Sequence, residues 1–287
     1  MTLVIAQRFR NRVSFSSDSR TSLGSAGHID FGVKVFSIPV KIESPVRSET
    51  GASTLDYEHS VGLAVIGSVV NSYTVKEQVH ELLQHLQHIP GYTDFSMEGI
   101  SKLVHIVFMR ATNELYAIMK NNGLCQLILG GYCPLQERIR IFKHSVDSDG
   151  TMAPTHAEIL VTDGIDFFGS PDALTAARKA YARIGNNRPL HVVRDVVKDP
   201  AITSVDGGLQ YGEFAYQDFK VYGVEDFIIN ADGSVVDILF TLRGLHLYKG
   251  EFQRDEEGFH IAHTFKQPFE SEIKAAFDAF LAKTDRS

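Results

Sequence analysis

The chain has 287 residues, of which 44% are hydrophobic and 22% charged, and its formal net charge is −7. This length suits one large domain or two small ones, and the negative charge argues against a nucleic-acid partner because no basic face offsets phosphate charge. No apolar run approaches the length that crosses a bilayer, no signal peptide is evident and the two cysteines fit a reducing compartment. We therefore expect a cytoplasmic protein without a membrane partner.

The first half of the chain is expected to form strands, then two helices, then strands again. Apolar runs predict strands at 2–9, 13–17, 33–38 and 62–66. Apolar residues recur at helical spacing from Val75 to Ile89, where Pro90-Gly91 ends the helix, and again from about Met97 to Arg110. The pattern then predicts strands at 114–120, 125–130, 139–144 and 155–161.

The second half opens with a helix that Ser170-Pro171-Asp172 begins and that runs to about Ile184. We expect further elements at 189–198 (helix), 226–230 and 234–242 (strands), and from about Pro268 (an amphipathic helix). Strands and helix pairs that alternate in blocks indicate an α+β fold with antiparallel sheets. No linker or repeat is evident, so we expect one domain over 1–287, with an insertion at about 44–57.

The residue after Met1 is the first candidate for chemistry. Thr2 is small enough to permit removal of Met1, and we expect that removal to leave Thr2 with a free α-amine beside its hydroxyl. These two groups form a self-contained nucleophile and base for acyl transfer.

The polar residues downstream of Thr2 have a distinctive spacing. Asp18 follows Thr2 by 16 residues and Lys34 by 32, and Gly67 ends an apolar strand. This set resembles the proteasome β subunits within the N-terminal nucleophile hydrolases, and most closely their bacterial (betaproteobacterial) homologues. The resemblance covers most of 1–243 and leaves about 244–287 as a C-terminal extension. It implies a four-layer αββα sandwich, with two antiparallel sheets between helix pairs.

The resemblance also assigns roles that suit each residue type. Thr2 Oγ would attack a peptide carbonyl, and a neutral α-amine would take its proton. Lys34 would stabilise the developing charge while Asp18 holds it and keeps it charged. The N–H of Gly67 would donate to the oxyanion, and Ser170 would hydrogen-bond the Thr2 amine.

One stretch departs from the family pattern. The family places an Asp, and a Ser three residues later, just before Gly-Gly, whereas this chain has Thr203-Ser204-Val205-Asp206-Gly207-Gly208. Anchoring on the glycines puts Asp206 at the Ser position, so either the pair is altered or the register slips and Ser204 contributes.

The resemblance extends to the substrate and the assembly. It implies that the pocket for the side chain before the cleaved bond is lined by Thr21, Ser22, Gly32, Phe36, Val65 and Val69. We expect this pocket to favour apolar side chains of polypeptide substrates. We further expect stacked homo-oligomeric rings, most simply a tetradecamer, and a separate ring ATPase for folded substrates.

Several alternatives remain open. The chain could be an N-terminal nucleophile amidohydrolase acting on a small amide, or a catalytically silent ring subunit. The segment His80 to His85 resembles a zinc-protease motif, but its histidines are five residues apart rather than four. We therefore expect no metal, and the absence of a Gly-rich phosphate loop predicts no nucleotide cofactor.

Overall fold

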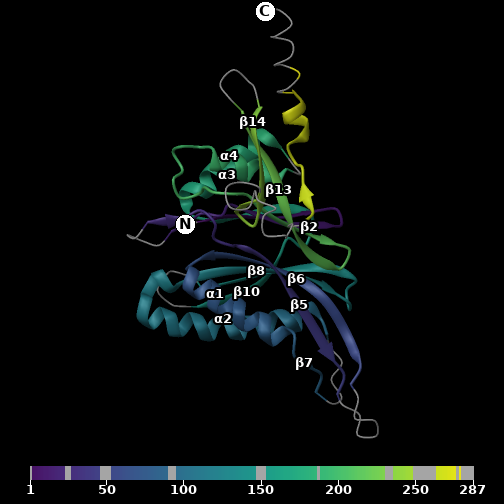
Figure 1. Ribbon diagram of the computed structural model, residues 1–287. Coiled ribbons are helices and arrows are strands. Elements are labelled where there is room, and N and C mark those ends of the chain that lie inside the picture. Colours follow the sequence, from purple (N-terminus) through teal and green to yellow (C-terminus); the bar gives the residue numbers. More distant parts are fainter. Residues whose placement is uncertain are drawn as a thin grey trace, which may run out of the picture.

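A computed structural model of the chain describes residues 2–22, 27–45, 53–89, 95–146, 153–185, 188–229, 235–247, 263–275 and 278. Its strands form sheets of eight, six and two strands. Helices α1 (Val69–Leu83) and α2 (Met97–Met119) lie on one side of the two larger sheets, and α3 (Pro171–Ile184) and α4 (Pro189–Val197) on the other (Figure 1). The N-terminal strand lies between the two groups.

The eight-stranded sheet contains both ends of the described chain. Its order is β11 (Gly164–Gly169), β1 (Leu3–Phe9), β2 (Arg12–Ser17), β12 (Gln210–Ala215), β13 (Asp218–Ile229), β14 (Val235–Leu242) and β15 (Leu245–Leu247), with β16 (Phe265–Lys266) beside β13. The long strand β13 pairs with β12 along its first half and with β14 along its second half. The sheet therefore bends at the middle of β13.

The six-stranded sheet is built around a long hairpin. Its order is β10 (Pro154–Ile159), β9 (Arg138–Val146), β8 (Cys125–Cys133), β6 (Leu55–Gly67), β5 (Val35–Glu43) and β7 (Leu86–Gln87). The short strands β3 (Thr21–Ser22) and β4 (His28–Ile29) form the third sheet. The expected insertion at about 44–57 falls at the tip of the β5–β6 hairpin, where 46–52 lie outside the described residues.

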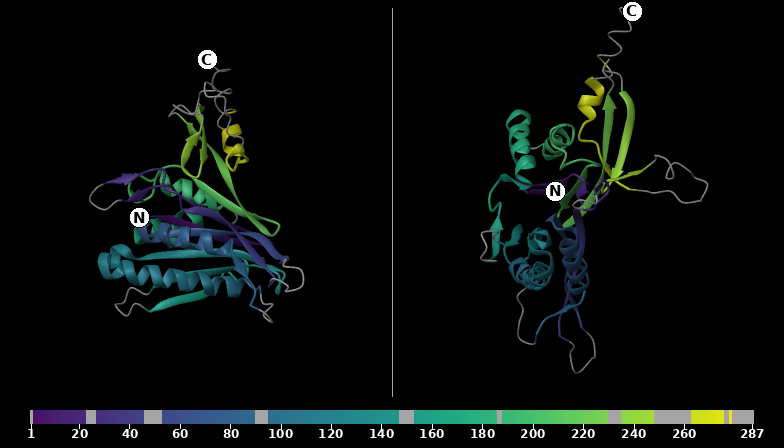
Figure 2. Two further views of the ribbon diagram at one scale, coloured as in Figure 1. Left: turned by 60° about the horizontal axis from the view of Figure 1, so that its bottom comes forward. Right: turned by 90° about the vertical axis from the view of Figure 1, so that its left-hand side faces the viewer.

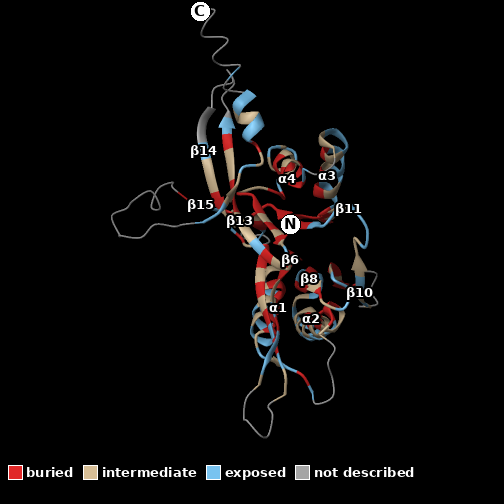
Figure 3. Cartoon of the chain, turned by 90° about the vertical axis from the view of Figure 1, so that its right-hand side faces the viewer, coloured by how far each residue is buried: buried red, intermediate tan, exposed pale blue. Residues whose placement is uncertain are grey.

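Three apolar clusters hold these elements together. The first lies between α1, α2 and the six-stranded sheet, and the second lies between α3, α4 and the eight-stranded sheet. The third joins the two sheets through side chains that include Phe15, Ile128 and Phe219. Figure 3 shows the buried segments gathered along the strands between the two helix pairs. Each such side chain contributes about 1.5–3 kcal/mol when it is buried. The third cluster therefore fixes how β1, which follows Thr2, lies over β5 and β6.

The predicted four-layer αββα sandwich with two antiparallel sheets was wrong. Strand exceeds helix, 43% against 32%, and one sheet is curled like half a barrel. A third sheet is present, and the β5–β7 and β13–β16 pairs are parallel. The eight-stranded sheet changes direction within β13, which pairs with β12 over its first half and with β14 over its second half. A Cβ at Gly223, in the middle of β13, would lie 2.4 Å from the Phe265 ring, so β16 can lie beside β13 only because this position has no side chain.

Two further expectations need correction. The predicted strand at 114–120 is wrong, because α2 continues to Met119. Helix formers such as Leu115 and Ala117 favour this, and Ile118 is 81% exposed, so its apolar character does not mark a buried strand. Strands β11 and β12 were also missed. The helix begun by Ser170-Pro171 is confirmed as α3.

The C-terminal segment is tied to the rest of the fold. Residues 270–275 form a helix that stands beside β13 and β14 (Figure 2), and the preceding Phe269 is fully buried in the second cluster. Glu272 pairs with Arg194 of α4 at 2.7 Å. The expected end of the last helix, from 276 onward, lies outside the described residues apart from 278.

A stack of three histidines lies between α2 and the strands β9 and β10. His144 is buried, and its ring centroid is 5.4 Å from that of His105 and 5.1 Å from that of His156. The hydroxyl of Ser101 lies 3.3 Å from His144 Nε2 and 2.9 Å from His156 Nε2. Burial, reinforced by the two neighbouring imidazoles, lowers the pKa of His144 to about 3.

This stack predicts a loss of stability in acid. A histidine in the unfolded chain has a pKa of about 6.5, so the unfolded state takes up the proton as pH falls below that value while His144 resists it. Unfolding should therefore become easier between pH ~6.5 and pH ~3, by up to roughly 1.4 kcal/mol per pH unit for this group. The free energy of urea unfolding at pH 7.5, 6 and 5 should fall less steeply in His144→Gln than in wild type.

The matched control is His85→Gln, because the His85 side chain is 70% exposed beside Glu81. This variant should follow the wild-type pH dependence. Equal slopes in His144→Gln and wild type would show that the stack does not govern acid stability.

Candidate active site

The first strand hairpin brings the N-terminal residues to one place. Val4 of β1 lies opposite Ser17 of β2, so Thr2 and Asp18 lie at the same end of the hairpin. The Leu3 N–H donates to Asp18 Oδ1 at 3.0 Å, and the Ser17 hydroxyl donates to the Leu3 carbonyl at 2.7 Å. The backbone that carries Thr2 is therefore held by side chains from β2 and the residue after it.

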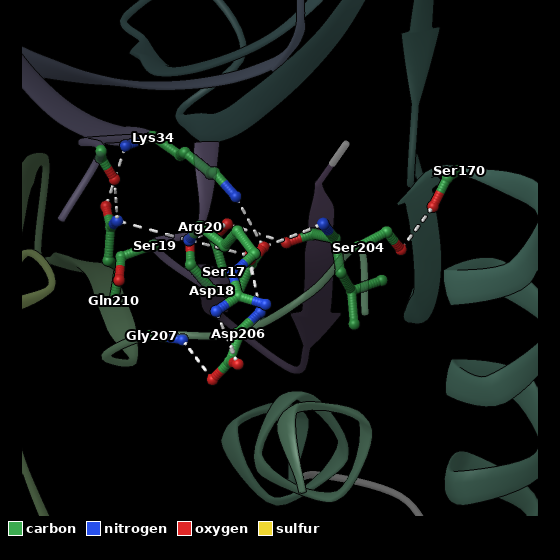
Figure 4. A network of polar contacts seen from close by, with 12 residues as sticks. Ser17, Asp18, Ser19, Arg20, Lys34, Ser170, Ser204, Asp206, Gly207 and Gln210 are labelled. Atoms are coloured by element: carbon green, nitrogen blue, oxygen red, sulfur yellow. Dashed lines mark hydrogen bonds and ion pairs between the residues drawn. The ribbon is translucent and has the colours of Figure 1, made fainter. Parts of the chain in front are cut away.

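Asp18 and Lys34 form a buried ion pair (Figure 4). Lys34 Nζ lies 2.8 Å from Asp18 Oδ1, and the two side chains are 4% and 0% exposed. The other carboxylate oxygen accepts from the backbone N–H groups of Arg20 (3.1 Å) and Asp206 (3.3 Å). Burial lowers the pKa of Lys34, and the nearby Asp18 carboxylate opposes that shift.

Gln210, at the start of β12, supports Lys34 from the opposite side. Its Oε1 accepts from the backbone N–H groups of Lys34 (2.9 Å) and Val35 (3.2 Å). Its Nε2 donates to the carbonyls of Gly32 (2.7 Å) and Asp18 (3.3 Å). Sequence reasoning missed Gln210. The sequence did contain a signal for it: Gln210 lies two residues before Gly212 and four before Phe214, and this period of two predicts that all three face the interior from the same side of a strand.

Thr2, Lys34 and Gly67 line one small pocket. Its volume is about 20 Å³, room for about one water molecule. Gly67 ends β6 with φ of +99°, and a Cβ there would lie 2.7 Å from the Leu124 carbonyl oxygen. Only glycine fits this conformation and this close approach. The backbone of Gly67 can thus lie beside Thr2 without an intruding side chain.

The expected substrate-binding residues divide into two groups. Thr21, Val65 and Val69 line the pocket beside Thr2, and the structure adds three residues that sequence reasoning missed, Val33, Ser72 and Tyr73. The others do not line it. Gly32 packs against the Thr21 side chain, Ser22 is exposed, and Phe36 is buried in the first cluster with its ring against Tyr73.

Ser170 joins the site through a chain of hydroxyl groups. Its N–H donates to the Thr2 carbonyl at 3.3 Å, and its Oγ lies 3.2 Å from Ser204 Oγ, which donates to Asp172 Oδ2 at 2.8 Å. Hydrogen bonding, first from Ser170 and then from Ser204, lowers the pKa of Asp172. The Ser170 side chain does not cap α3, so capping does not account for this serine.

Asp206 faces a different partner. Its carboxylate lies 2.8 Å from Arg20 Nη2, and Arg20 also donates to both oxygens of Asp30, at 2.6 and 2.9 Å. Only the backbone N–H of Asp206 reaches Asp18. Within 203–208, the side chain linked to Ser170 is therefore that of Ser204, as in the slipped register considered from sequence.

Comparisons with known proteins define the fold. No protein-family model matches the chain, and no curated protein matches it. Among solved structures, Anbu (ancestral β-subunit) from Yersinia bercovieri superposes with a TM-score of 0.52 and 14% identity over 76% of this chain and 86% of that one. A Gly-1 mutant of Anbu from Hyphomicrobium sp. strain MC1 has a TM-score of 0.52 and 13% identity over 100% and 98%. Anbu from Pseudomonas aeruginosa, a helical assembly, has a TM-score of 0.52 and 14% identity over 77% and 85%.

These matches correct the family expected from sequence. These solved structures are all Anbu (ancestral β-subunit) proteins, and no family model or curated protein supports the assignment of this chain as a proteasome β subunit. At this identity the likeness shows the fold alone. In the described part of the chain, no helix is long and apolar enough to cross a membrane, and no group of three or more His, Cys, Asp or Glu side chains is placed to hold a metal ion.

The Asp18–Lys34 pair predicts a specific pattern of stability. Asp18→Asn should lower the free energy of unfolding by about 3–5 kcal/mol, because it leaves the Lys34 ammonium buried without a counter-charge. The double variant Asp18→Asn with Lys34→Met should recover part of that loss, because no buried charge remains. Urea unfolding at pH 7.5 measures both.

An exposed ion pair in the six-stranded sheet provides the control. Lys41 and Glu58 lie 3.2 Å apart with side chains 46% and 54% exposed, so Glu58→Gln should cost less than about 1 kcal/mol. A cost for Asp18→Asn no larger than that of Glu58→Gln would contradict the prediction.

Proposed function

We propose that the chain is a threonine-dependent peptide hydrolase in which Thr2, with a free α-amine, is the nucleophile. The observation that carries this proposal is the buried pair of Lys34 and Asp18 at 2.8 Å, together with the pocket that Thr2, Lys34 and Gly67 share. A hydroxyl needs a neighbouring base and a stabilised oxyanion to attack an amide. These residues are of the types that supply both.

The reaction would proceed in two acyl-transfer steps. Thr2 Oγ attacks the peptide carbonyl while its proton passes to the neutral α-amine, directly or through water. The oxyanion accepts a hydrogen bond from the Gly67 N–H, and the bond to the leaving amine breaks as that amine takes up the proton. Water then attacks the ester and releases the acid, which restores the Thr2 hydroxyl.

Lys34 and Ser170 would set the protonation state of the amine. A cationic Lys34 beside Thr2 disfavours a second positive charge and so lowers the pKa of the α-amine. The series of hydrogen bonds from Ser170 through Ser204 to Asp172 would orient the α-amine on the side away from Lys34.

The pocket favours polypeptides with an apolar side chain before the cleaved bond. Its lining includes the apolar or aromatic residues Val33, Val65, Val69 and Tyr73. Its volume of about 20 Å³ is far smaller than such a side chain, so substrate binding requires the wall to open.

We further propose that the chain assembles with copies of itself. Support comes from the fold shared with Anbu of P. aeruginosa, which is a helical assembly. Assembly into a helix or into stacked rings would restrict access to the Thr2 site, and folded substrates would then require a separate ATPase. One domain over 1–287 remains our proposal for each copy.

Intact mass spectrometry with a peptide epoxyketone tests the chemistry. This inhibitor forms a stable ring only with an amine and a hydroxyl on one residue. We expect a mass that corresponds to Thr2 as the first residue, and one covalent adduct per chain. Thr2→Ala should form none, and Lys34→Met should form it at least about 100-fold more slowly, because proton transfer contributes about 10²–10⁴-fold.

The control is Lys41→Met, which removes an exposed lysine on β5 and should react at the wild-type rate. A mass that retains Met1, or a free Thr2 that forms no adduct, would contradict the proposal and favour a catalytically silent subunit. Adduct formation with hydrolysis of small acyl amides but not of peptides would favour an amidohydrolase.

Light scattering at micromolar concentration tests assembly. We expect a mass many times the 31.9 kDa of one chain. Electron microscopy would then distinguish a closed double ring from an open helix. The sequence predicts fourteen copies for the double ring. A monomer would overturn the assembly proposal without affecting the adduct test.

A further inference from the structure

The turn between β14 and β15 reaches the candidate active site from the C-terminal part of the chain. Leu242 and Leu245 lie opposite one another, so Arg243 and Gly244 form a two-residue hairpin loop. Their φ angles are +53° and +89°. This is the type I′ pattern, in which Asn or Gly is usual at the first position and arginine is strained.

The loop is packed against residues that hold Asp18 and Lys34. A Cβ on Gly244 would lie 2.3 Å from Ser19 Cβ, and a Cβ on Gly208 would lie 2.9 Å from Gly244 Cα. Thr241, just before the loop, donates to the Leu209 and Val224 carbonyls at 3.3 and 3.2 Å. The backbone of Arg243 is therefore fixed beside Ser19, one residue after Asp18.

The side chain of Arg243 is a partly buried cation without a counter-charge. Its Cζ lies 5.0 Å from the centre of the Phe36 ring, and its Nε is out of contact with solvent. Among the residues that the structure describes, Arg243 has no hydrogen-bond or ion-pair partner. Burial lowers its pKa, and the hydroxyl of Tyr73 offsets part of that shift. A guanidinium with five donors is seldom left unpaired at such a place.

The neighbouring cations are already engaged. Lys34 pairs with Asp18, and Arg20 pairs with Asp30 and Asp206. Lys76, which lies 5.5 Å from the Phe36 ring, pairs with Glu77 at 2.8 Å. Among the cations of the described residues around Phe36, Arg243 is thus the one that no described carboxylate engages. It lies close to the pocket, because Phe36 packs edge-on against Tyr73, a pocket-lining residue.

We propose that Arg243 is a specificity-determining residue that binds a carboxylate of the substrate, so that the site prefers peptides with an acidic side chain close to the cleaved bond. The inference rests on the proposed function, since it names the substrate class of the same site. A carboxylate accepts two parallel hydrogen bonds from a guanidinium, and its charge would balance the unpaired cation. The apolar pocket beside Thr2 takes one side chain, and Arg243 acts on another.

Matched peptide epoxyketones test this preference. Each pair has Leu at the reacting position and either Glu or Gln at one of the three positions before it. The rate of adduct formation is measured by intact mass for wild type, Arg243→Met, Arg243→Lys and the control Arg110→Met. Arg110 is suited to this role because its side chain is 84% exposed on α2, and its replacement changes the net charge equally.

We expect the Glu peptide of one pair to react about tenfold faster than its Gln partner, as a hydrogen bond to a charged group would give. Arg243→Met should abolish the difference with little change for the Gln peptide. Arg243→Lys should retain part of it, and Arg110→Met all of it. Equal rates within every pair in wild type, or an undiminished preference in Arg243→Met, would overturn the inference.

Binding to a protein that cannot react separates this inference from the chemistry of Thr2. Fluorescein-labelled Glu and Gln peptides are titrated into Thr2→Ala, with and without Arg243→Met, and followed by anisotropy. A Glu preference that depends on Arg243, in the absence of any wild-type adduct, would reject the hydrolase and keep the carboxylate site. If the wild type forms adducts but the Glu and Gln peptides react at equal rates, the hydrolase is kept and the carboxylate site is rejected. Equal or undetectable binding of both peptides would likewise overturn the carboxylate site.

Discussion

The buried ion pair between Asp18 and Lys34 is the constraint on which the candidate site depends. An isolated ammonium in this position would be costly, and the carboxylate repays that cost only because its other contacts are also satisfied. Asp18 accepts from Lys34 Nζ, from the backbone next to Thr2 and from two further N–H groups. One carboxylate thus fixes the N-terminal strand, the lysine and the 206–208 loop together.

Close backbone packing completes the arrangement around this pair. Gly67 and Gly169 bring β6 and β11 against neighbouring backbone, with Gly169 next to the Thr2 carbonyl. Gln210 adds hydrogen bonds to four backbone groups, the N–H groups of Lys34 and Val35 and the carbonyls of Asp18 and Gly32. These contacts fix the backbone around the candidate site, and the pocket beside Thr2 has a volume of only about 20 Å³.

The C-terminal part of the chain belongs to the same structure as the site. The extension expected from about 244 begins at the loop that packs on Ser19 and Gly208. Farther along, Phe269 is fully buried and Glu272 pairs with Arg194. Arg194 also stacks on Phe227 and Phe269, with its Cζ 4.2 and 4.1 Å from the ring centres. The segment from Gly244 onward is therefore packed both against the candidate site, through Ser19, and against α4, through Arg194.

The sequence by itself determined the strands at whose ends Thr2, Asp18 and Lys34 lie, because alternating and continuous apolar runs mark β1, β2 and β5. The structure brings two of these ends together, with Lys34 Nζ 2.8 Å from Asp18 Oδ1, while the catalytic roles of the three residues stay a proposal. Only the tertiary structure decided the partners that arrive from far along the chain: Gln210 on Lys34, Ser204 on Ser170, and Arg243 beside Phe36. It also turned Asp206 toward Arg20 and curled one sheet out of the expected sandwich. Local patterns encode which face of a strand is buried, but not which distant strand will cover it.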